Sequence, residues 1–360
     1  MTTALDPGAT PRTTRRATLS NGTAVARLGR LRGANNEGVL AVLILVLALA
    51  VGFVAPSFWS AATAVNLIGS ASATMVFALG VLLVLISGGI DVSFMAIGIF
   101  AAYSTLKAAQ HSGWASGNVV VPFAAAIVIG ILLGLVNAAA ISKLRIPTLI
   151  ATLGTQGVIR GMLISFVGSR VISDLPGATA GLSTSYLFVA GGQVKTPLTV
   201  LVVPIAALCV LVALMLRNTM FGRSVYALGA DVESTRRAGF SVGWTQLRVY
   251  VLAGGLAAVG GLIHVVLVRE ADPFALVGGE LDVIAAVVLG GASIFGGKGS
   301  VTGTVLGVLL ISLIDNSLIL LGVPSSWQRA AVGFLLLVGV SVQGLQAKRP
   351  RRTAAVEVFA

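Results

Sequence analysis

The sequence predicts an all-α polytopic membrane protein with about ten transmembrane helices. Its 360 residues are 56% hydrophobic and only 10% charged, and the mean hydropathy is +1.00. A soluble protein carries roughly 25% charged residues. The chain also holds 44 glycines, and glycine is more frequent in membrane helices than in soluble ones. These features place the chain in a multi-pass membrane class.

Ten apolar runs are long enough, or nearly so, to cross a bilayer, which takes about 20 mostly apolar residues. They cover 38–55, 64–86, 91–109, 119–141, 147–167, 197–216, 245–267, 281–295, 301–321 and 327–345. The eighth run is short, which indicates a broken or re-entrant helix. Residues 168–196 form the longest predicted outer segment, and its interpretation stays open between an ordinary loop and a contact for an extracytoplasmic partner.

The charges predict the orientation of these spans. With ten spans and the N-terminus inside, the inner segments hold 18 of the 24 cations and the outer loops hold Lys107, Arg170, Lys195 and Arg269. Arg160 and Arg329 lie within spans. Because cytoplasmic segments of membrane proteins are enriched in Lys and Arg, both termini are predicted to be cytoplasmic.

Three regions follow from this arrangement. Residues 1–36 are polar and arginine-rich, and we expect a disordered, basic cytoplasmic tail. Residues 37–346 form the transmembrane domain, whose first helix lacks a clear cleavage site after it and so is kept. Residues 347–360 form a second basic cytoplasmic tail.

The most informative segment is the polar stretch 217–244, which lies between two long apolar runs. Within it Asp231 and Glu233 come first, Arg236 and Arg237 follow, and Gly239 closes. Acids in the first turn and cations in the last turn suit the helix dipole, and glycine is a favoured stop. The pattern predicts a helix of about two turns on the cytoplasmic surface, offered to a partner.

Other site classes are excluded or disfavoured by the residues present. Cys209 is the only cysteine, so a disulfide within the chain is excluded. His111 and His264 are far apart in sequence, and no metal site or catalytic constellation is predicted. The net charge of +12 follows membrane topology, so nucleic-acid binding is not expected. The stretch GGASIFGGKGS fails the phosphate-loop pattern at Ala292 and Gly299.

Charged groups near or inside spans are candidates for a translocation pathway, because such charges are costly in a membrane and usually face a cavity or a partner. The candidates are Asp91, with the neighbouring Ser93, and Glu280, Asp282 and Asp315. Asp91 and Asp282 also fit the role of a helix cap. Asp315 is deeper, and pairing with Arg160 or with Arg329 remains open.

Glycine patterns add two structural expectations. The stretches SGGID (87–91) and VGGELD (277–282) open predicted spans of opposite direction, as an inverted repeat with broken helices would. Small-residue seams at 130–134, 157–161 and 303–307 allow close helix packing.

The chain resembles the permease subunits of ATP-binding-cassette importers for ribose and related simple sugars, including the rhamnose and autoinducer-2 branches. Four stretches carry the resemblance: SGGIDVSFMAIG (87–98), RIPTLIATLGTQGVIRG (145–161), MFGRSVYALGADVESTRRAGFSV (220–242) and GGELDVIAAVVLGGASIFGGKGSVTGTVLG (278–307). Together they span nearly the whole chain. One departure is the bulk of Phe94 and Met95, where the family has smaller residues.

The resemblance implies a set of partners. A second permease subunit, identical or a sister chain, completes the pore, and two ATPase subunits dock on the cytoplasmic face with their own ATP and Mg²⁺. An extracytoplasmic sugar-binding protein delivers the substrate. The resemblance also implies that the coupling helix is the segment from Gly229 and Ala230 to Gly239.

We therefore expect a transport subunit, not an enzyme, in a bacterial cytoplasmic membrane. It imports a simple sugar or sugar-like molecule by alternating access, and it has no cofactor of its own. The alternative is a secondary transporter driven by an ion gradient, which Asp315 and the inverted pattern favour.

Overall fold

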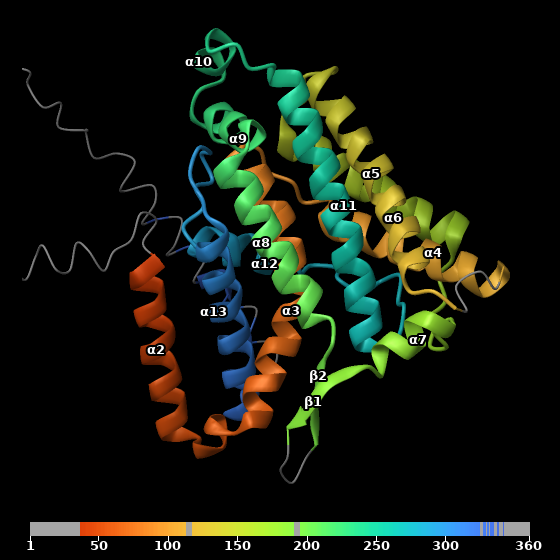
Figure 1. Ribbon diagram of the computed structural model, residues 1–360, viewed down its shortest axis with the longest axis vertical. Coiled ribbons are helices and arrows are strands. Elements are labelled where there is room, and N and C mark those ends of the chain that lie inside the picture. Colours follow the sequence, from red (N-terminus) through yellow and green to blue (C-terminus); the bar gives the residue numbers. More distant parts are fainter. Residues whose placement is uncertain are drawn as a thin grey trace, which may run out of the picture.

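The computed structural model describes residues 37–112, 117–190 and 195–324, together with isolated positions between 327 and 341. The first predicted tail (1–36) and the second (347–360) lie outside this part, as does most of the tenth predicted span. Figure 1 shows a bundle of long helices with α10 at one end and the β1–β2 hairpin at the other. We refer to these as the α10 end and the hairpin end.

The described elements follow the predicted order of spans. They are α2 (Glu37–Val54), η1 (Pro56–Trp59), α3 (Ala61–Ile86), α4 (Phe94–Ser112), α5 (Val120–Ser142), α6 (Thr148–Met162), η2 (Leu163–Val167), α7 (Gly177–Ser183), β1 (Tyr186–Ala190), β2 (Thr196–Thr199), α8 (Val202–Asn218), α9 (Met220–Ala230), α10 (Val232–Arg237), α11 (Val242–Val268), α12 (Glu280–Leu289) and α13 (Val301–Leu320).

The helical membrane class is confirmed. Among the described residues, six helices are long and apolar enough to cross a membrane, and seven if the bent pair α8–α9 counts as one span. The eighth predicted span is only the ten-residue α12, as its length indicated. The predicted outer segment 168–196 contains α7, and strand β1 pairs there with the antiparallel β2. The ten-span count remains a prediction.

Helix α11 is the centre of the bundle and packs against α3, α4 and α5. Its approach to α5 is close because both helices present glycines. A Cβ added at Gly130 would lie 2.3 Å from the Gly254 carbonyl oxygen, and one at Gly134 would lie 2.4 Å from the Tyr250 oxygen. The backbones therefore touch directly, as small-residue seams allow.

The main core contains the second half of α3, the first turns of α4, most of α12 and part of α11. Helix α3 is buried almost continuously from Ala71 to Ile86. Helix α2 lies at the periphery against α13, as Figure 1 shows, and exposes large apolar side chains such as Leu45 and Phe53. An apolar surface of this kind fits a lipid solvent, since a water-soluble protein would bury it.

Two helices of the bundle start after irregular, non-helical backbone. Helix α4 begins at Phe94, three residues later than predicted, after the irregular stretch 87–93. Helix α12 begins at Glu280 after the irregular stretch 269–279. Gly88 and Gly278 have φ values of 83° and 85° in these stretches, a conformation that glycine adopts without strain.

Candidate functional site

Helix α10 lies at the tip of the molecule and is fixed at its start by a side-chain cap (Figure 1). The Asp231 carboxylate accepts a hydrogen bond from the Ser234 amide at 2.5 Å, in the N-cap position. This hydrogen bond lowers the pKa of the Asp231 carboxyl below its usual value, because it favours the ionised form. The predicted acid at the helix start therefore holds the first turn together.

The end of α10 is fixed by a glycine. Gly239 has φ 85°, and its amide donates to the Arg236 carbonyl at 3.0 Å. The Phe240 amide donates to the Thr235 carbonyl at 3.2 Å. These two bonds form a Schellman motif, which satisfies the last carbonyls of the helix. The helix is six residues long, slightly shorter than the two turns predicted.

The charged side chains of α10 point into solvent. Arg236 and Arg237 lie 3.0 Å and 3.5 Å from the two carboxylate oxygens of Glu233. Their side chains are 66% and 79% exposed, and that of Glu233 is 55% exposed. Exposed pairs of this kind add little stability, so these cations are available to a partner.

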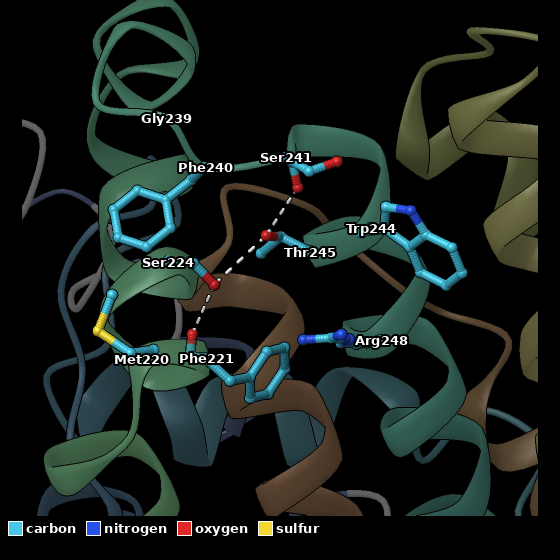
Figure 2. Close-up of a pocket in the computed structure, with 9 residues that line it drawn as sticks. All are labelled: Met220, Phe221, Ser224, Gly239, Phe240, Ser241, Trp244, Thr245 and Arg248. Carbon is cyan, nitrogen blue, oxygen red and sulfur yellow. Dashed lines mark hydrogen bonds between the residues drawn. The ribbon is translucent and has the colours of Figure 1, made fainter.

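A hollow of about 380 Å³ lies beside the joint between α10 and α11. Figure 2 shows its lining, with Trp244 on the side of α11 and with Phe240, Met220 and Phe221 on the side of α9. A hydrogen bond of 3.3 Å between the hydroxyls of Thr245 and Ser224 joins α11 to α9 across this wall. An apolar hollow next to an exposed charged helix is suited to receive part of another protein.

A second hollow, of about 810 Å³, lies on the other side of this joint. Its lining is more polar and includes Arg145, Arg236 and Gln246. Short helix α10 is therefore flanked by two depressions, and Arg236 belongs to the wall of one of them.

Four glycines connect α9 with the rest of the bundle, and we call them the glycine junction: Gly88, Gly229, Gly296 and Gly297. A Cβ added at Gly229 would lie 1.8 Å from the Ile86 carbonyl oxygen and 2.5 Å from the Gly297 nitrogen. The Gly297 amide also donates to the Ile86 carbonyl at 2.9 Å. The end of α9 thus touches both the end of α3 and the α12–α13 loop through backbone atoms.

The irregular stretch before α4 is held by hydroxyl groups of α6. The Ile90 and Val92 amides donate to the hydroxyls of Thr148 and Thr152, at 3.1 Å and 3.3 Å. The Thr152 hydroxyl in turn lies 3.3 Å from the Ile90 carbonyl. Non-helical backbone at membrane depth needs such partners, because no water is present to supply them.

Asp91 and Ser93 lie in the same stretch and are buried. One Asp91 oxygen accepts from both the amide and the hydroxyl of Ser93, each at 2.7 Å. The Asn137 side chain donates to the Ser93 hydroxyl at 2.8 Å. Asp91 therefore closes an Asx turn on the Ser93 amide just before α4, whereas a helix cap would bind the amide of the second or third helical residue.

Glu280 opens α12 and is held by α6. Its carboxylate forms an ion pair with Arg160 and accepts a hydrogen bond from the side-chain Nε2 of Gln156 at 2.8 Å. Arg160 therefore binds Glu280, and the pairing of Arg160 with Asp315 is wrong. Arg329 lies outside the described residues. The Glu280 side chain is 9% exposed and that of Arg160 is 26% exposed, so the pair is close to the open side of α6.

The starts of α4 and α12 lie next to one another. A Cβ added at Gly279 would lie 3.1 Å from the end of the Met95 side chain. Asp282 on α12 interacts electrostatically with Asp315 on α13. The structure thus gathers Glu280, Asp282 and Asp315 around α12, while Asp91 and Ser93 lie around the start of α4.

Two of the three predicted glycine seams are filled within this chain. Helix α11 packs against Gly130 and Gly134, as described above, and α12 packs against Gly307. A Cβ added at Gly307 would lie only 1.9 Å from the Ala286 carbonyl oxygen. In contrast, no atom of the described residues lies within 4 Å of a Cβ added at Gly157 or Gly161 on α6. The side of α6 around this seam also exposes large apolar residues, among them Ile150 and Val158.

Sequence reasoning did not identify the contacts that join these elements. Gln156, Thr148 and Thr152 were not singled out, and neither was the role of Gly88, Gly296 and Gly297. Threonine and glutamine in an apolar run are a weak signal. The run of glycines around 296–299 contributes to the family motif and fails the phosphate-loop pattern, but its spacing also suits a tight turn against backbone, which the sequence analysis did not predict.

Comparison with known proteins identifies the chain. Residues 63–340 match a family model described as a branched-chain amino acid transport system / permease component. The chain belongs to this permease family. The resemblance drawn from the four sequence motifs is therefore confirmed, and the protein is a permease component of an importer driven by an ATP-binding cassette. In this family the permease works with ATPase and binding-protein partners, so the chain is a transport subunit.

Two groups of curated relatives match over most of their length. The ribose import permease protein RbsC of Escherichia coli (strain K12) is 34% identical over 301 residues, which are 84% of this chain and 91% of the relative. The autoinducer 2 import system permease protein LsrC of Yersinia pseudotuberculosis serotype O:3 (strain YPIII) is 32% identical over 312 residues, which are 86% of this chain and 84% of the relative. No solved structure matches the chain.

Proposed function

We propose that this permease carries a simple sugar or sugar-like molecule of the ribose or autoinducer-2 type across a bacterial cytoplasmic membrane. The relatives that match are import permeases for ribose and for autoinducer 2. The observation that carries the mechanism is the capped helix α10, which is exposed at one end and joined by the glycine junction to the pathway elements.

The α10 end is proposed to be cytoplasmic, with ten spans and both termini on that side. Four exposed cations of the segment 217–244 lie at this end: Arg217, Arg223, Arg236 and Arg237. The positive-inside rule supports the same orientation. The hairpin end then faces outward, where an extracytoplasmic sugar-binding protein docks.

Residues Gly229, Ala230, Asp231, Glu233, Arg236, Arg237 and Gly239 form the proposed coupling segment. The Asp231 cap and the Gly239 stop make α10 a rigid body. When two ATPase subunits close on ATP and Mg²⁺, which they bind themselves, each would carry α10 with it. The glycine junction then passes this motion to the end of α3 and to the α12–α13 loop as a shift of packed helices.

The translocation pathway is proposed to run past the starts of α4 and α12, along Asp91, Ser93, Glu280, Asp282 and Asp315. Broken helices at membrane depth are tolerated where they line a pathway or are buried in protein. Both broken starts adjoin α6, through Thr148 and Thr152 on one side and through Gln156 and Arg160 on the other. The hydroxyl-rich substrate passes over a polar lining that is sparse, which favours rapid release.

The open face of α6 is proposed to receive the second permease subunit, either a second copy or a sister chain. Among the described residues, nothing packs against the seam of Gly157 and Gly161, whereas the equivalent seams on α5 and α13 are filled by helices. If a helix of the second subunit packs closely against this seam, the Arg160–Glu280 pair lies between the two subunits. The proposed pathway of the dimer then runs along the interface between them.

The decisive experiment compares complexes that co-purify from the native membrane. The tagged chain should retain a stoichiometric ATPase in mild detergent, and the double variant R236E/R237E should lose it while remaining inserted. A matched control, R170E/K195E, makes the same charge change on exposed residues of the hairpin end and should keep the ATPase. Uptake that ignores ATP and collapses with the proton gradient would overturn the proposal.

A further inference from the structure

A groove of about 1030 Å³ lies between α8, α9, the turn 297–300 and α13. It is separate from the hollows beside α10 and from the broken starts of α4 and α12. Its volume is at the upper end of the range of small-molecule sites. Neither the coupling segment nor the proposed sugar pathway uses it.

The wall of the groove toward the middle of the bundle is apolar. Cys209, Ala213 and Leu216 contribute from α8, and Val305 and Leu306 contribute from α13. The neighbouring face of α8 exposes Val210, Leu211 and Leu214 by 57%, 62% and 49%. The groove therefore continues into a surface that faces lipid, and its depth is suited to hydrocarbon chains.

The opposite rim, toward the α10 end, carries three cations: Arg217, Arg223 and Lys298. All three are exposed, and within the described part of the chain none of them forms an ion pair. The one acid in the lining is Glu37, whose carboxylate accepts hydrogen bonds from the hydroxyls of Ser300 and Thr302. The groove lining therefore carries three cations and one carboxylate, and that carboxylate already accepts hydrogen bonds from Ser300 and Thr302.

The geometry of the bend fixes these cations at one depth. Helix α9 turns by 73° from α8, which sets Arg217 at the end of α8 and Arg223 on the first turns of α9. The turn is tight, because a Cβ added at Gly222 would lie 2.1 Å from the Leu216 carbonyl oxygen. Cations therefore line one rim of an apolar groove at the edge of the spans.

We propose that this groove binds an anionic phospholipid, with its phosphate at Arg217, Arg223 and Lys298 and an acyl chain along α8 and α13. The inference rests on the proposed orientation, in which this rim faces the cytoplasm. Basic pockets between membrane helices on that side are suited to anionic headgroups. At about 1 kcal/mol per cation, three cations correspond to a preference of roughly 100-fold over a zwitterionic lipid.

A lipid in the groove also contacts the coupling path. The lining includes Tyr226 of α9 and Gly297 of the glycine junction, and the Tyr226 hydroxyl donates to the Gly299 carbonyl at 2.8 Å. A bound phospholipid therefore braces the bend between α8 and α9 next to the elements that carry motion from α10.

The test measures lipid retention by native mass spectrometry of the purified full-length chain. Dioleoyl phosphatidylglycerol and dioleoyl phosphatidylcholine are supplied as an equal mixture. Wild type should retain phosphatidylglycerol with a preference of roughly 100-fold, and R217Q/R223Q/K298Q should lose that preference. The matched control K143Q/R145Q/R248Q removes three exposed cations that lie outside the groove and should keep the wild-type preference for phosphatidylglycerol.

Two further measurements locate the lipid. Cys209 is the only cysteine of the chain and lines the groove, so phosphatidylglycerol should slow its alkylation by N-ethylmaleimide. Ala213→Trp fills the apolar wall and leaves the cations intact, so it should also abolish retention. Because neither measurement involves sugar uptake or the ATPase, the result stands apart from the test of the coupling segment.

Three outcomes would overturn the inference. Equal phosphatidylglycerol retention by wild type and R217Q/R223Q/K298Q would show a non-specific lipid shell. Binding of glycerol 3-phosphate as tight as that of the lipid would assign the rim to a soluble phosphate ester. Protection of Cys209 that requires the ATPase chain instead of the lipid would assign the groove to a protein partner.

Discussion

Replacing Gly229 with alanine tests how motion of α10 reaches the bundle. In the structure an added Cβ would lie 1.8 Å from the Ile86 carbonyl oxygen and 2.5 Å from the Gly297 nitrogen. Both neighbours are backbone atoms, so no side-chain rotation relieves the clash. The contacts must open by about 1.5 Å, and overpacking of this kind costs about 1–3 kcal/mol.

The expected effect on transport follows from this cost. A penalty of about 2 kcal/mol that falls only on the closed junction shifts the balance between transport states roughly 30-fold. Sugar uptake per ATP hydrolysed should therefore fall strongly in Gly229→Ala. The unfolding temperature of the purified chain should fall by about 3 °C.

The assay uses the importer reconstituted in liposomes, with uptake and ATP hydrolysis measured together. Gly69→Ala is the matched control, because Gly69 lies on α3, the helix that forms one side of the junction, and has nothing within 4 Å of an added Cβ. It should transport normally and be slightly more stable. If Gly229→Ala keeps wild-type uptake, hydrolysis and unfolding temperature, the close backbone contact is not the route of coupling.

Three further predictions concern single charged groups. Glu280→Gln should destabilise the chain by about 3 kcal/mol in thermal unfolding, because it leaves Arg160 without its buried partner; an unchanged unfolding temperature would contradict the ion pair. Asp315→Asn should lower uptake by less than about tenfold, since the amide keeps the size and polarity of the side chain in a sparsely polar pathway; uptake that loses its proton dependence would instead point to an ion-coupled carrier. The α10 cap should respond to acid: the lowered pKa of Asp231 means that its contribution is complete above the ordinary value of 3.8 and is lost as the pH falls through the folded-state pKa. Amide hydrogen exchange over 232–238 should report this loss in wild type, whereas Asp231→Asn should show no such pH dependence.

Local patterns carried most of what the sequence could predict. Apolar runs identify membrane helices because each helix satisfies its own backbone and must match the bilayer in length. The short polar helix α10 was predictable for the same reason, since Asp231 and Gly239 act within one turn of the helix that they start and stop. The family resemblance followed from such contiguous motifs.

The short α12 and the late start of α4 show the limit of this reasoning. An apolar run reports only that a segment is buried in membrane or protein, and it does not distinguish helix from irregular backbone. Whether residues 87–93 form helix depends on hydroxyls of Thr148 and Thr152, about sixty positions away. The sequence predicted that the eighth span is short, but it did not predict which residues bind Glu280 at the start of α12.

The sequence by itself determined the membrane class, the order of helices, the short polar helix α10 and the importer family, because these depend on composition and on neighbours along the chain. Only the tertiary structure decided the partner of Arg160, the backbone contacts of Gly229 and which glycine seam stays open. Those depend on distances between residues far apart in the sequence. An ion pair or a glycine contact forms where two elements pack together, and the sequence around one residue does not indicate which distant residue it contacts.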